Sequence, residues 1–263
     1  MRAGERTGVS AVEPLWLVRA GTVAYRRAWA WQRALAERRV AGEVPDVVLL
    51  LEHPHVYTVG KRGSEADVLA RPEWLAAHGA EVVRSDRGGQ VTYHGPGQLV
   101  GYPITRLHPE PDVLRFVGRV ATALADVAGE LGLDARTDTG LRTGVWVGDA
   151  KLAAIGMRVS RGVTSHGFAL NCTTDLAMFD AIVACGMPRS RACSLSGLLG
   201  RTVAVDDALP LVERRLAERL GRVPVPVDAA TLDLPVADLW PDDLAGAPTT
   251  AAPERAAPET IHA

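Results

Sequence analysis

Few side chains of this chain are suited to nucleophilic or proton-transfer chemistry. Lysine occurs only at Lys61 and Lys151, although Lys and Arg together number 29. Lys151 precedes the apolar segment 152–156, and a lysine at the margin of apolar surroundings can lose its proton near neutral pH. A neutral amine is what a general base requires. The alternative is an ordinary turn lysine whose ammonium group reaches solvent.

Three cysteines could supply a nucleophile. Cys193 has Arg189 and Arg191 nearby, and positive charge lowers a thiol pKa, whereas Cys185 lies in a loop beside a glycine and Cys172 ends a predicted strand. Most single cysteines are small buried apolar residues, so spacing does not choose between Cys185 and Cys193. An odd number without CxxC spacing argues against a disulfide framework or a zinc site.

The segment from Arg87 to Ile104 is unusually rich in glycine. It contains Gly88-Gly89 and the turn sequence Gly-Pro-Gly, so its backbone can adopt positive φ and lie close to another group. Residues 90–93 and 99–102 are predicted to be extended. We therefore expect a hairpin-like wall with Arg87 and His94 at its ends, suited to a ligand that lies against the backbone. The alternative is a tight hairpin with a solvated Arg and His.

Other polar residues occur near predicted strand ends. His53 and His55 flank a proline, but no third ligand follows at metal-binding spacing, which favours a structural or substrate-lining role over a metal site. His166 and Asn171 belong to the predicted strand 164–171 and could line a pocket or form hydrogen bonds in the core. No metal site is predicted.

The composition excludes several classes of protein. The 263 residues carry a formal net charge of −2, which argues against a general nucleic-acid binder, and 47% are hydrophobic, enough for a substantial core. No apolar run is long enough to span a membrane, and the N-terminus lacks the apolar core of a signal peptide. We expect a protein of the reducing cytoplasm without membrane or nucleic-acid partners.

Periodicity and turn residues predict short strands with interspersed helices. Residues 1–14 are expected to form a flexible arm, 15–221 one catalytic domain, and 222–263 a Pro- and Ala-rich tail, largely disordered towards its C-terminus. The fold class is α+β, with a mixed or antiparallel sheet flanked by helices. Strands are predicted at 15–18, 47–51, 82–84, 90–93, 99–102, 144–151, 152–160, 164–171 and 202–205, and helices at 23–40 capped by Thr22, 72–78, 113–131 capped by Asp112, from Thr173 or Thr174 to 183, 194–199 and 207–220.

Four motifs in this order resemble the lipoyl(octanoyl) transferases of lipoate biosynthesis. They are RGGQVTYHGPGQLV from Arg87, KLAAIG from Lys151, HGFALN from His166 and ACG around Cys185. The resemblance extends from about Leu15 to Leu220. It implies the biotin/lipoate protein ligase fold, a mixed sheet flanked by helices.

The resemblance also assigns roles that the spacing leaves open. It makes Cys185 the nucleophile that carries an acyl thioester and Lys151 the partner that lowers the thiol pKa, and it gives Cys193 no role. The substrate-binding residues that it implies are Arg87, Gly88, Gly89, Gln90, Val91, Thr92, Tyr93, His94, Ala154, Ile155, Gly156, Gly167, Phe168 and Ala169, while His53, His166 and Asn171 are candidates for lining the pocket.

The implied substrates are octanoyl-acyl carrier protein and the lysine of lipoyl domains, in 2-oxoacid dehydrogenase E2 subunits and in the glycine cleavage H protein. The octanoyl thioester is already activated, so no cofactor or ATP is expected, in agreement with the lack of a Walker sequence. Both protein partners are expected to be acidic. The arginines of residues 19–39, including Arg26 and Arg27, are a candidate docking surface.

Three other functions remain open at this point. An ATP-dependent lipoate or biotin ligase of the same fold would need a nucleotide site and no cysteine. A Cys-dependent amidotransferase would move octanoyl groups between lipoyl proteins. A non-catalytic acyl-binding module would keep the glycine-rich wall but would need neither Lys151 nor Cys185.

Overall fold

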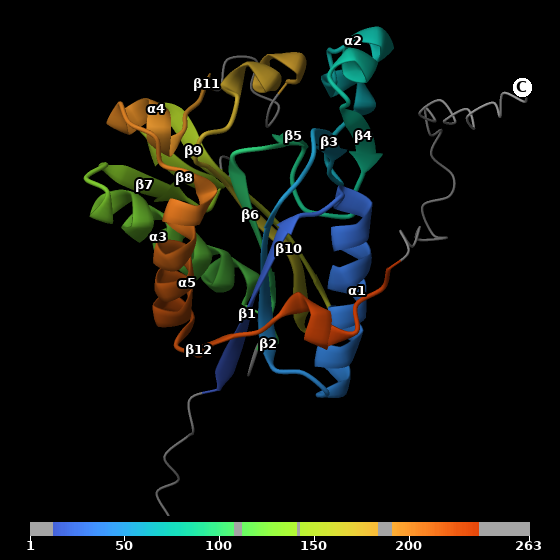
Figure 1. Ribbon diagram of the computed structural model, residues 1–263, viewed down its shortest axis with the longest axis vertical. Helices are drawn as coiled ribbons and strands as arrows, with labels where there is room; N and C mark the ends of the chain where they lie inside the picture. Colours follow the sequence, from blue (N-terminus) through green and yellow to red (C-terminus); the bar gives the residue numbers. More distant parts are fainter. Residues whose placement is uncertain (1–12, 108–111, 141–142, 184–190, 237–263) are drawn as a thin grey trace, which may run out of the picture.

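The computed structural model describes residues 13–107, 112–140, 143–183 and 191–236, and these form two sheets covered by helices (Figure 1). The main sheet has the order β12-β1-β2-β6-β10-β9-β8-β7, with β11 paired to β9. β12, β1 and β2 are parallel to one another, whereas β2 through β7 along this path are paired antiparallel. The strands are β12 (Val223–Pro226), β1 (Pro14–Thr22), β2 (Asp46–Glu52), β6 (Gln98–Ile104), β10 (Val163–Asn171), β9 (Ala150–Ser160), β8 (Gly144–Val147), β7 (Ala135–Asp138) and β11 (Arg191–Ala192).

Helices cover both faces of the main sheet. α3 (Val113–Glu130) and α5 (Val205–Leu220) pack on one face, and α1 (Tyr25–Ala41) packs on the other, to the right in Figure 1. This arrangement explains the continuous apolar run of β2, because Val48 and Leu50 enter the α3/α5 core while Val47 and Leu49 enter the α1 core.

A second sheet has three strands in the order β4-β3-β5. It consists of β4 (Glu81–Arg84), β3 (Val56–Val59) and β5 (Val91–His94), and it packs on the 3₁₀ helix η2 (Leu176–Ala181). The remaining short helices are η1 (Glu65–Asp67), α2 (Pro72–Ala77), α4 (Leu195–Leu199) and η4 (Ala229–Leu232). The observed α+β architecture, a mixed sheet flanked by helices, is the predicted fold class.

The predicted hairpin of β5 and β6 is wrong. β5 pairs with β3 in the small sheet, whereas β6 pairs with β2 and β10 in the main sheet. The turn at Gly95–Gly97 carries the chain from one sheet to the other, and Gly97 has φ +76°. Gly97 accepts hydrogen bonds at its carbonyl from the N–H groups of Cys172 and Thr173, so the turn is fixed to the end of β10.

Several boundaries also differ from the predictions. The predicted strand 202–205 is absent, because residues 202–204 are irregular and Val205 begins α5, where the Asp207 carboxylate accepts from the Ala204 N–H at 2.9 Å. α1 follows Ala24 rather than a Thr22 cap, and η2 is capped by Asp175 rather than Thr173 or Thr174.

Part of the predicted C-terminal tail is ordered. β12 adds a parallel strand to β1, and Leu232 of η4 is buried in the α1 core. The sequence did not predict this strand, because the short run 223–227 has no periodicity of its own and is stabilised by pairing with β1. Residues 1–12 and 237–263, the other parts of the predicted arm and tail, lie outside the described residues.

Gly167 on β10 packs directly against the backbone of β6. A Cβ at Gly167 would lie 2.1 Å from the Gly101 carbonyl oxygen, which is backbone and cannot move aside. Gly167→Ala is therefore expected to lower the free energy of unfolding by about 3 kcal/mol. Gly129→Ala in α3, where a Cβ meets no atom within 4 Å, is the control and is expected to raise it by about 1 kcal/mol. Urea unfolding measures both, and equal stability of the two variants would contradict this close contact.

Candidate active site

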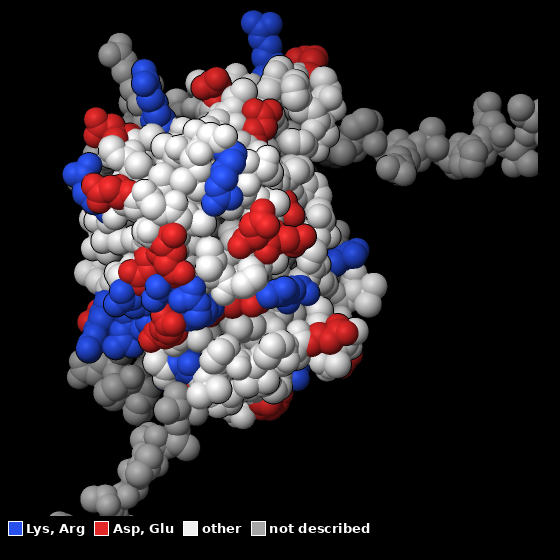
Figure 2. Space-filling view, turned by 60° about the vertical axis from the view of Figure 1, so that its left-hand side comes forward, with Lys and Arg blue, Asp and Glu red and all other residues white. Residues whose placement is uncertain are grey.

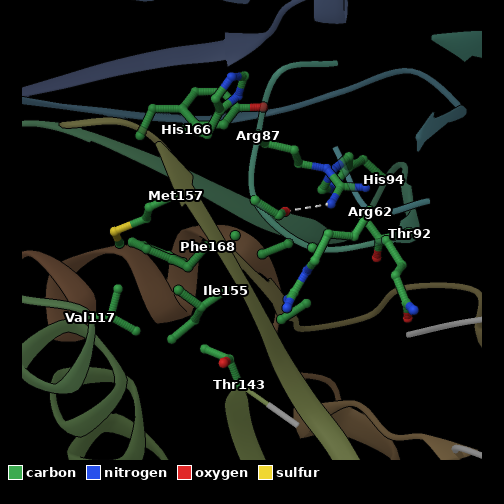
Figure 3. Close-up of a pocket in the computed structure, with 18 of the residues that line it drawn as sticks. Arg62, Arg87, Thr92, His94, Val117, Thr143, Ile155, Met157, His166 and Phe168 are labelled. Atoms are coloured by element: carbon green, nitrogen blue, oxygen red, sulfur yellow. Dashed lines mark hydrogen bonds between the residues drawn. The ribbon is translucent and has the colours of Figure 1, made fainter. Parts of the chain in front are cut away.

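A cavity of about 210 Å³ lies between α3, the central strands β9 and β10, and the glycine-rich loop 87–90 (Figure 3). Val117, Ile155, Met157 and Phe168 form its apolar side, and Figure 3 shows Arg62, Thr92 and His94 together on another side. The described residues that line it are Tyr25, Arg62, Arg87, Gly88, Gly89, Gln90, Val91, Thr92, His94, Tyr102, Val113, Leu114, Val117, Thr139, Thr143, Lys151, Ala154, Ile155, Gly156, Met157, His166, Gly167, Phe168 and Ala169.

The cavity brings together most of the residues proposed to bind substrate, although they come from three separate motifs. Residues 87–92 and His94 come from the glycine-rich loop and β5, residues 154–156 from β9, and residues 167–169 from β10. β9 and β10 pair antiparallel with Gly156 opposite Gly167, which explains why the second and third motifs meet.

The glycine-rich loop packs directly on β9. The Gly88 N–H donates to the Met157 carbonyl at 3.1 Å, and a Cβ at Gly156 would lie 2.7 Å from the Gly88 carbonyl oxygen. These two glycines therefore allow two segments of backbone to approach each other. From the sequence, these glycines were expected to leave a bare backbone surface for a ligand. At Gly88 and Gly156 that space is instead occupied by the protein's own backbone.

Arg87 fixes the loop from inside. Its side chain is buried, with Nε donating to Thr58 Oγ1 at 2.9 Å, Nη2 to the Thr58 carbonyl at 2.5 Å and Nη1 to the Gly88 carbonyl at 3.0 Å. These contacts join the loop to β3 of the small sheet. The alternative of a solvated Arg87 on a hairpin is wrong.

Lys151 lies on β9 at the wall of the cavity and is half-buried. Its Nζ donates to the Thr143 carbonyl at 3.3 Å and lies 4.8 Å from the centre of the Trp146 ring. β11 pairs with β9 here, with Ala192 opposite Lys151, and the Cys193 N–H donates to the Lys151 carbonyl at 3.0 Å. The chain that follows residues 184–190 therefore runs beside Lys151.

Two of the three cysteines are poorly suited to be nucleophiles. Burial raises the pKa of Cys172 to about 12 and the pKa of Cys193 to about 11, so neither thiol forms thiolate readily at neutral pH. Among the described residues, burial is the one cause of the Cys193 pKa shift, and Arg191 does not offset it; Arg189 lies outside the described residues. Cys185 lies outside the described residues.

Three of the candidate residues do not line this cavity. His53 is fully buried: its Nδ1 donates to the Val23 carbonyl at 2.6 Å, its Nε2 accepts from the Tyr102 hydroxyl at 2.7 Å, and burial lowers its pKa to about 4. Tyr93 points to the other face of β5, where its hydroxyl lies 2.7 Å from His55 Nδ1. Asn171 is buried at the end of β10. Their positions are set by hydrogen bonds within the core.

His166 and His94 do line the cavity. His166 has φ +55° and a buried side chain, and its Nε2 donates to Asp86 Oδ1 at 2.6 Å. Burial lowers the His166 pKa against the opposing effect of the Asp86 carboxylate, and burial together with Arg87 lowers the His94 pKa well below its usual range. Both rings are neutral at neutral pH.

Several lining residues were not predicted from the sequence. Val113 and Val117 belong to the apolar stripe of α3, and nothing in that stripe separates a residue that faces a cavity from one that packs in the core. Arg62 follows Gly60 in a loop whose backbone pairs with the glycine-rich loop, since the Arg62 N–H donates to the Gly89 carbonyl at 3.0 Å. Only the pairing of distant loops brings it to the site.

Among the described residues, no three or more His, Cys, Asp or Glu side chains lie close enough together to hold a metal ion. None of the described helices is sufficiently long and apolar to cross a membrane.

The fold is that of lipoate-protein ligase catalytic domains. A crystal structure of lipoate-protein ligase A bound with ATP superposes with a TM-score of 0.68 at 18% identity, covering 82% of this chain and 89% of that one. A bi-partite lipoate protein ligase from Thermoplasma acidophilum gives a TM-score of 0.67 at 17% identity, covering 82% and 87%. At these identities the similarity establishes the fold alone.

Sequence comparison is more specific. The family described as lipoyl protein ligase A/B catalytic domain matches residues 24–217. An octanoyltransferase of Salinispora tropica is 54% identical over 77% of this chain and 94% of its own, and one of Acidothermus cellulolyticus is 49% identical over 80% and 96%. The chain belongs to the lipoyl protein ligase A/B catalytic-domain family and, within it, to the octanoyltransferases.

Proposed function

We propose that this chain transfers an octanoyl group from octanoyl-acyl carrier protein to a lysine of lipoyl domains, through a thioester on Cys185 with Lys151 as acid–base partner. As an octanoyltransferase by family, it is an acyltransferase that acts in lipoate biosynthesis. The observation that carries the mechanism is the position of Lys151 on the wall of a largely apolar cavity, beside the strand that the chain enters shortly after Cys185.

The length of chain between Cys185 and β11 allows the thiol to approach Lys151. Six peptide units join Cys185 to Arg191, so their Cα atoms are at most about 21 Å apart, and Arg191 pairs with Ala150, the residue before Lys151. On the other side the Val183 N–H donates to the Asp67 carbonyl at 2.8 Å. Since burial raises the pKa of Cys172 and Cys193, Cys185 is the best candidate for a reactive thiol.

The reaction that we propose has two steps. Lys151 takes the proton of the Cys185 thiol, or holds the thiolate as an ion pair with its ammonium group, and the sulfur attacks the thioester carbonyl. The carrier leaves as a thiol that receives its proton from Lys151, which is then neutral. The amine of the acceptor lysine then attacks octanoyl-Cys185, Lys151 accepts the amine proton, and an amide forms as the Cys185 sulfur leaves. Cleavage of the octanoyl thioester provides the free energy for forming the amide bond, so the reaction needs no ATP.

The apolar side of the cavity suits the hydrocarbon tail. Burying about seven methylene and methyl groups supplies roughly 6 kcal/mol at ~0.8 kcal/mol each. Val117, Ile155 and Phe168 would provide this contact, and the polar groups around Arg62 and Thr92 lie elsewhere on the wall.

The wall formed by Val117 should set the preferred chain length. Val117→Phe fills space in the cavity, so kcat/KM with octanoyl-carrier is expected to fall at least tenfold, with a smaller loss for hexanoyl-carrier, because a methylene in an apolar pocket changes selectivity by roughly 10–200-fold. Val117→Ala should shift the preference towards decanoyl-carrier. Competition assays with mixed acyl carriers measure both, and identical preferences in the two variants would show that the tail binds elsewhere.

The predicted arginine docking surface is largely paired within the chain. Arg19 contacts Glu213 at 2.6 Å, Arg26 contacts Glu81 at 3.2 Å and Arg39 contacts Asp46 at 2.8 Å. On the side of the molecule that carries α3 and α5, Figure 2 shows a group of Lys and Arg side chains with Asp and Glu among them, where Arg214 and Arg215 contact Glu130. A carrier that docks on Arg26 and Arg27 would compete with such internal contacts.

Charge reversal tests this surface. If the acidic carrier docks there, Arg26→Glu and Arg27→Glu are each expected to raise KM for octanoyl-carrier about fivefold with kcat unchanged, and the effect should shrink as salt is added. Arg136→Glu on β7 makes the same charge change at an exposed position on the opposite edge of the main sheet and is the control. An unchanged KM in both variants would contradict docking of the carrier on Arg26 and Arg27.

The proposed function as a whole is tested by adding one substrate at a time. A lipoyl domain should become octanoylated with octanoyl-carrier and without ATP. Modification that needs free octanoate and ATP would instead indicate a ligase, and transfer only from an octanoylated lipoyl protein would indicate an amidotransferase. Tight acyl binding without modification would indicate a non-catalytic module.

A further inference from the structure

Two buried amide side chains join the cavity wall to the strand beside Lys151. Gln98 on β6 and Asn171 on β10 are direct partners in the antiparallel register, with only 1% and 4% of their surface exposed. Gln98 Nε2 donates to Asn171 Oδ1 at 2.9 Å. Burying an amide is costly unless its donors and acceptors are satisfied, so this pair needs an explanation beyond packing.

The orientation of both amides follows from the two backbone carbonyls that they contact. Asn171 Nδ2 lies 2.9 Å from the Cys193 carbonyl and Gln98 Nε2 lies 3.3 Å from the Tyr93 carbonyl. A carbonyl only accepts, so each of these amide nitrogens must be the donor. Asn171 Oδ1 and Gln98 Oε1 are consequently acceptors, and the direction of the chain of hydrogen bonds has no alternative.

One end of this chain of hydrogen bonds determines the tautomer of His94. Gln98 Oε1 lies 2.8 Å from His94 Nδ1 and can only accept, so Nδ1 carries the proton. The groups that face His94 are Arg87, His53, His166 and the stacked ring of Tyr25, and burial with the first three lowers its pKa. His94 Nε2 is therefore an unprotonated acceptor, and it lies 3.5 Å from the hydroxyl of buried Thr58, which can donate to it.

The other end holds the strand beside Lys151. Asn171 Nδ2 binds the Cys193 carbonyl, and the N–H of the same residue donates to the Lys151 carbonyl at 3.0 Å. β11, directly before Cys193, pairs with β9 over only two residues, Arg191 and Ala192. A two-residue strand has little stability of its own, so the Asn171 contact is a substantial part of what anchors it.

We propose that Gln98 and Asn171 are positioning residues: Gln98 holds the cavity-lining His94 with Nδ1 protonated and Nε2 as an acceptor, and Asn171 anchors β11 against Lys151. The link to catalysis rests on the function proposed above. In that reaction the acceptor lysine attacks as a neutral amine, and His94 Nε2 can accept one of its N–H groups in exchange for the long 3.5 Å contact with the Thr58 hydroxyl. His94 in Figure 3 lies next to Arg62 and Thr92, on the polar side of the cavity.

The tautomer of His94 is measurable without any activity. In ¹⁵N-labelled wild-type protein, long-range ¹H–¹⁵N spectra are expected to show a protonated Nδ1 and a bare Nε2 for His94, unchanged from pH 5 to pH 8. Assignment uses His94→Gln. A proton on Nε2, or titration within this range, would overturn the Gln98 part of the proposal.

Variants separate the two roles. Gln98→Leu removes the acceptor for Nδ1, so the Nε2-protonated tautomer of His94 should appear, and Gln98→Glu, which can still accept, should restore the wild-type tautomer. Asn171→Asp still accepts from Gln98 but places an oxygen against the Cys193 carbonyl. It should leave the tautomer unchanged and lower kcat about tenfold or more, with KM for octanoyl-carrier within twofold, as expected for misplacement of reacting groups.

Thr164→Val is the matched control, because Thr164 is a fully buried polar residue on the same strand whose hydroxyl contacts only backbone near residues 103–105. The Thr164→Val protein should be less stable than the wild type, with the His94 tautomer and kcat unchanged. If Asn171→Asp is no slower than Thr164→Val, the Asn171 role is refuted while octanoyl transfer stands. If wild-type protein forms no octanoyl adduct, the proposed function fails while the tautomer result is unaffected.

Discussion

Mixing the protein with octanoyl-acyl carrier protein in the absence of acceptor is expected to add one octanoyl group to the chain, and Cys185→Ser is expected to abolish this adduct. The physical reason is that an acyl thioester needs a thiolate, and a serine hydroxyl does not ionise at neutral pH. Intact-mass spectrometry resolves the two outcomes directly. In Cys185→Ser, kcat for octanoyl transfer should also fall, by a factor of at least about a thousand, because covalent catalysis is lost.

Cys193→Ser and Cys172→Ser are the matched controls. Burial raises the pKa of these two thiols to about 11 and about 12, so both variants should still form the adduct. Serine is small enough to occupy either site, although burying its hydroxyl costs some stability. An adduct that persists in Cys185→Ser and disappears in Cys193→Ser would assign the nucleophile to Cys193 instead.

Substitution of Lys151 should have an effect of similar size. Lys151→Ala is expected to lower kcat by about a thousandfold, within the range for loss of a general acid–base group, with KM for octanoyl-carrier nearly unchanged. Lys151→Arg should be nearly as slow, because a guanidinium group keeps its proton and cannot serve as a base. Steady-state transfer to a lipoyl domain measures kcat, and Lys61→Ala is the control for the other lysine.

Alkylation of Cys185 separates the role of Lys151 in activating the thiol from its role in the second step. The rate of iodoacetamide modification against pH reports the thiol pKa, which should rise in Lys151→Ala because a nearby positive charge has been removed. Retention of more than a tenth of wild-type kcat in Lys151→Ala would contradict the acid–base role. An unchanged alkylation profile with a slow kcat would restrict Lys151 to the attack by the acceptor amine.

Local sequence patterns determined the elements that surround the site. α3 follows from apolar residues at spacings of three and four after Asp112, whose side chain accepts from the Arg115 N–H at 2.9 Å. The meander β8-β9-β10 follows from the turns at Gly148 and Gly162, both with positive φ. These predictions were right because helix periodicity, caps and tight turns depend on neighbours within a few residues.

The family and its four motifs were also evident in the sequence alone. The motifs named most of the residues that line the cavity, including Arg87, Lys151 and Gly156. What they did not reveal is the purpose of the glycines. Gly88 and Gly156 are needed because two backbones touch, whereas the sequence suggested space for a ligand.

Only the tertiary structure decided which strands pair. β5 and β6 are separated by a tight turn, as in a hairpin, yet they belong to different sheets because Tyr93 and Val91 pack with η2 while Leu99 and Val100 enter the cores of the main sheet. Residues 223–226 form the strand β12 because they pair with β1. The contacts among His94, Gln98, Asn171 and Cys193 join four segments, and hydrogen bonds between residues so far apart leave no periodic trace in a sequence.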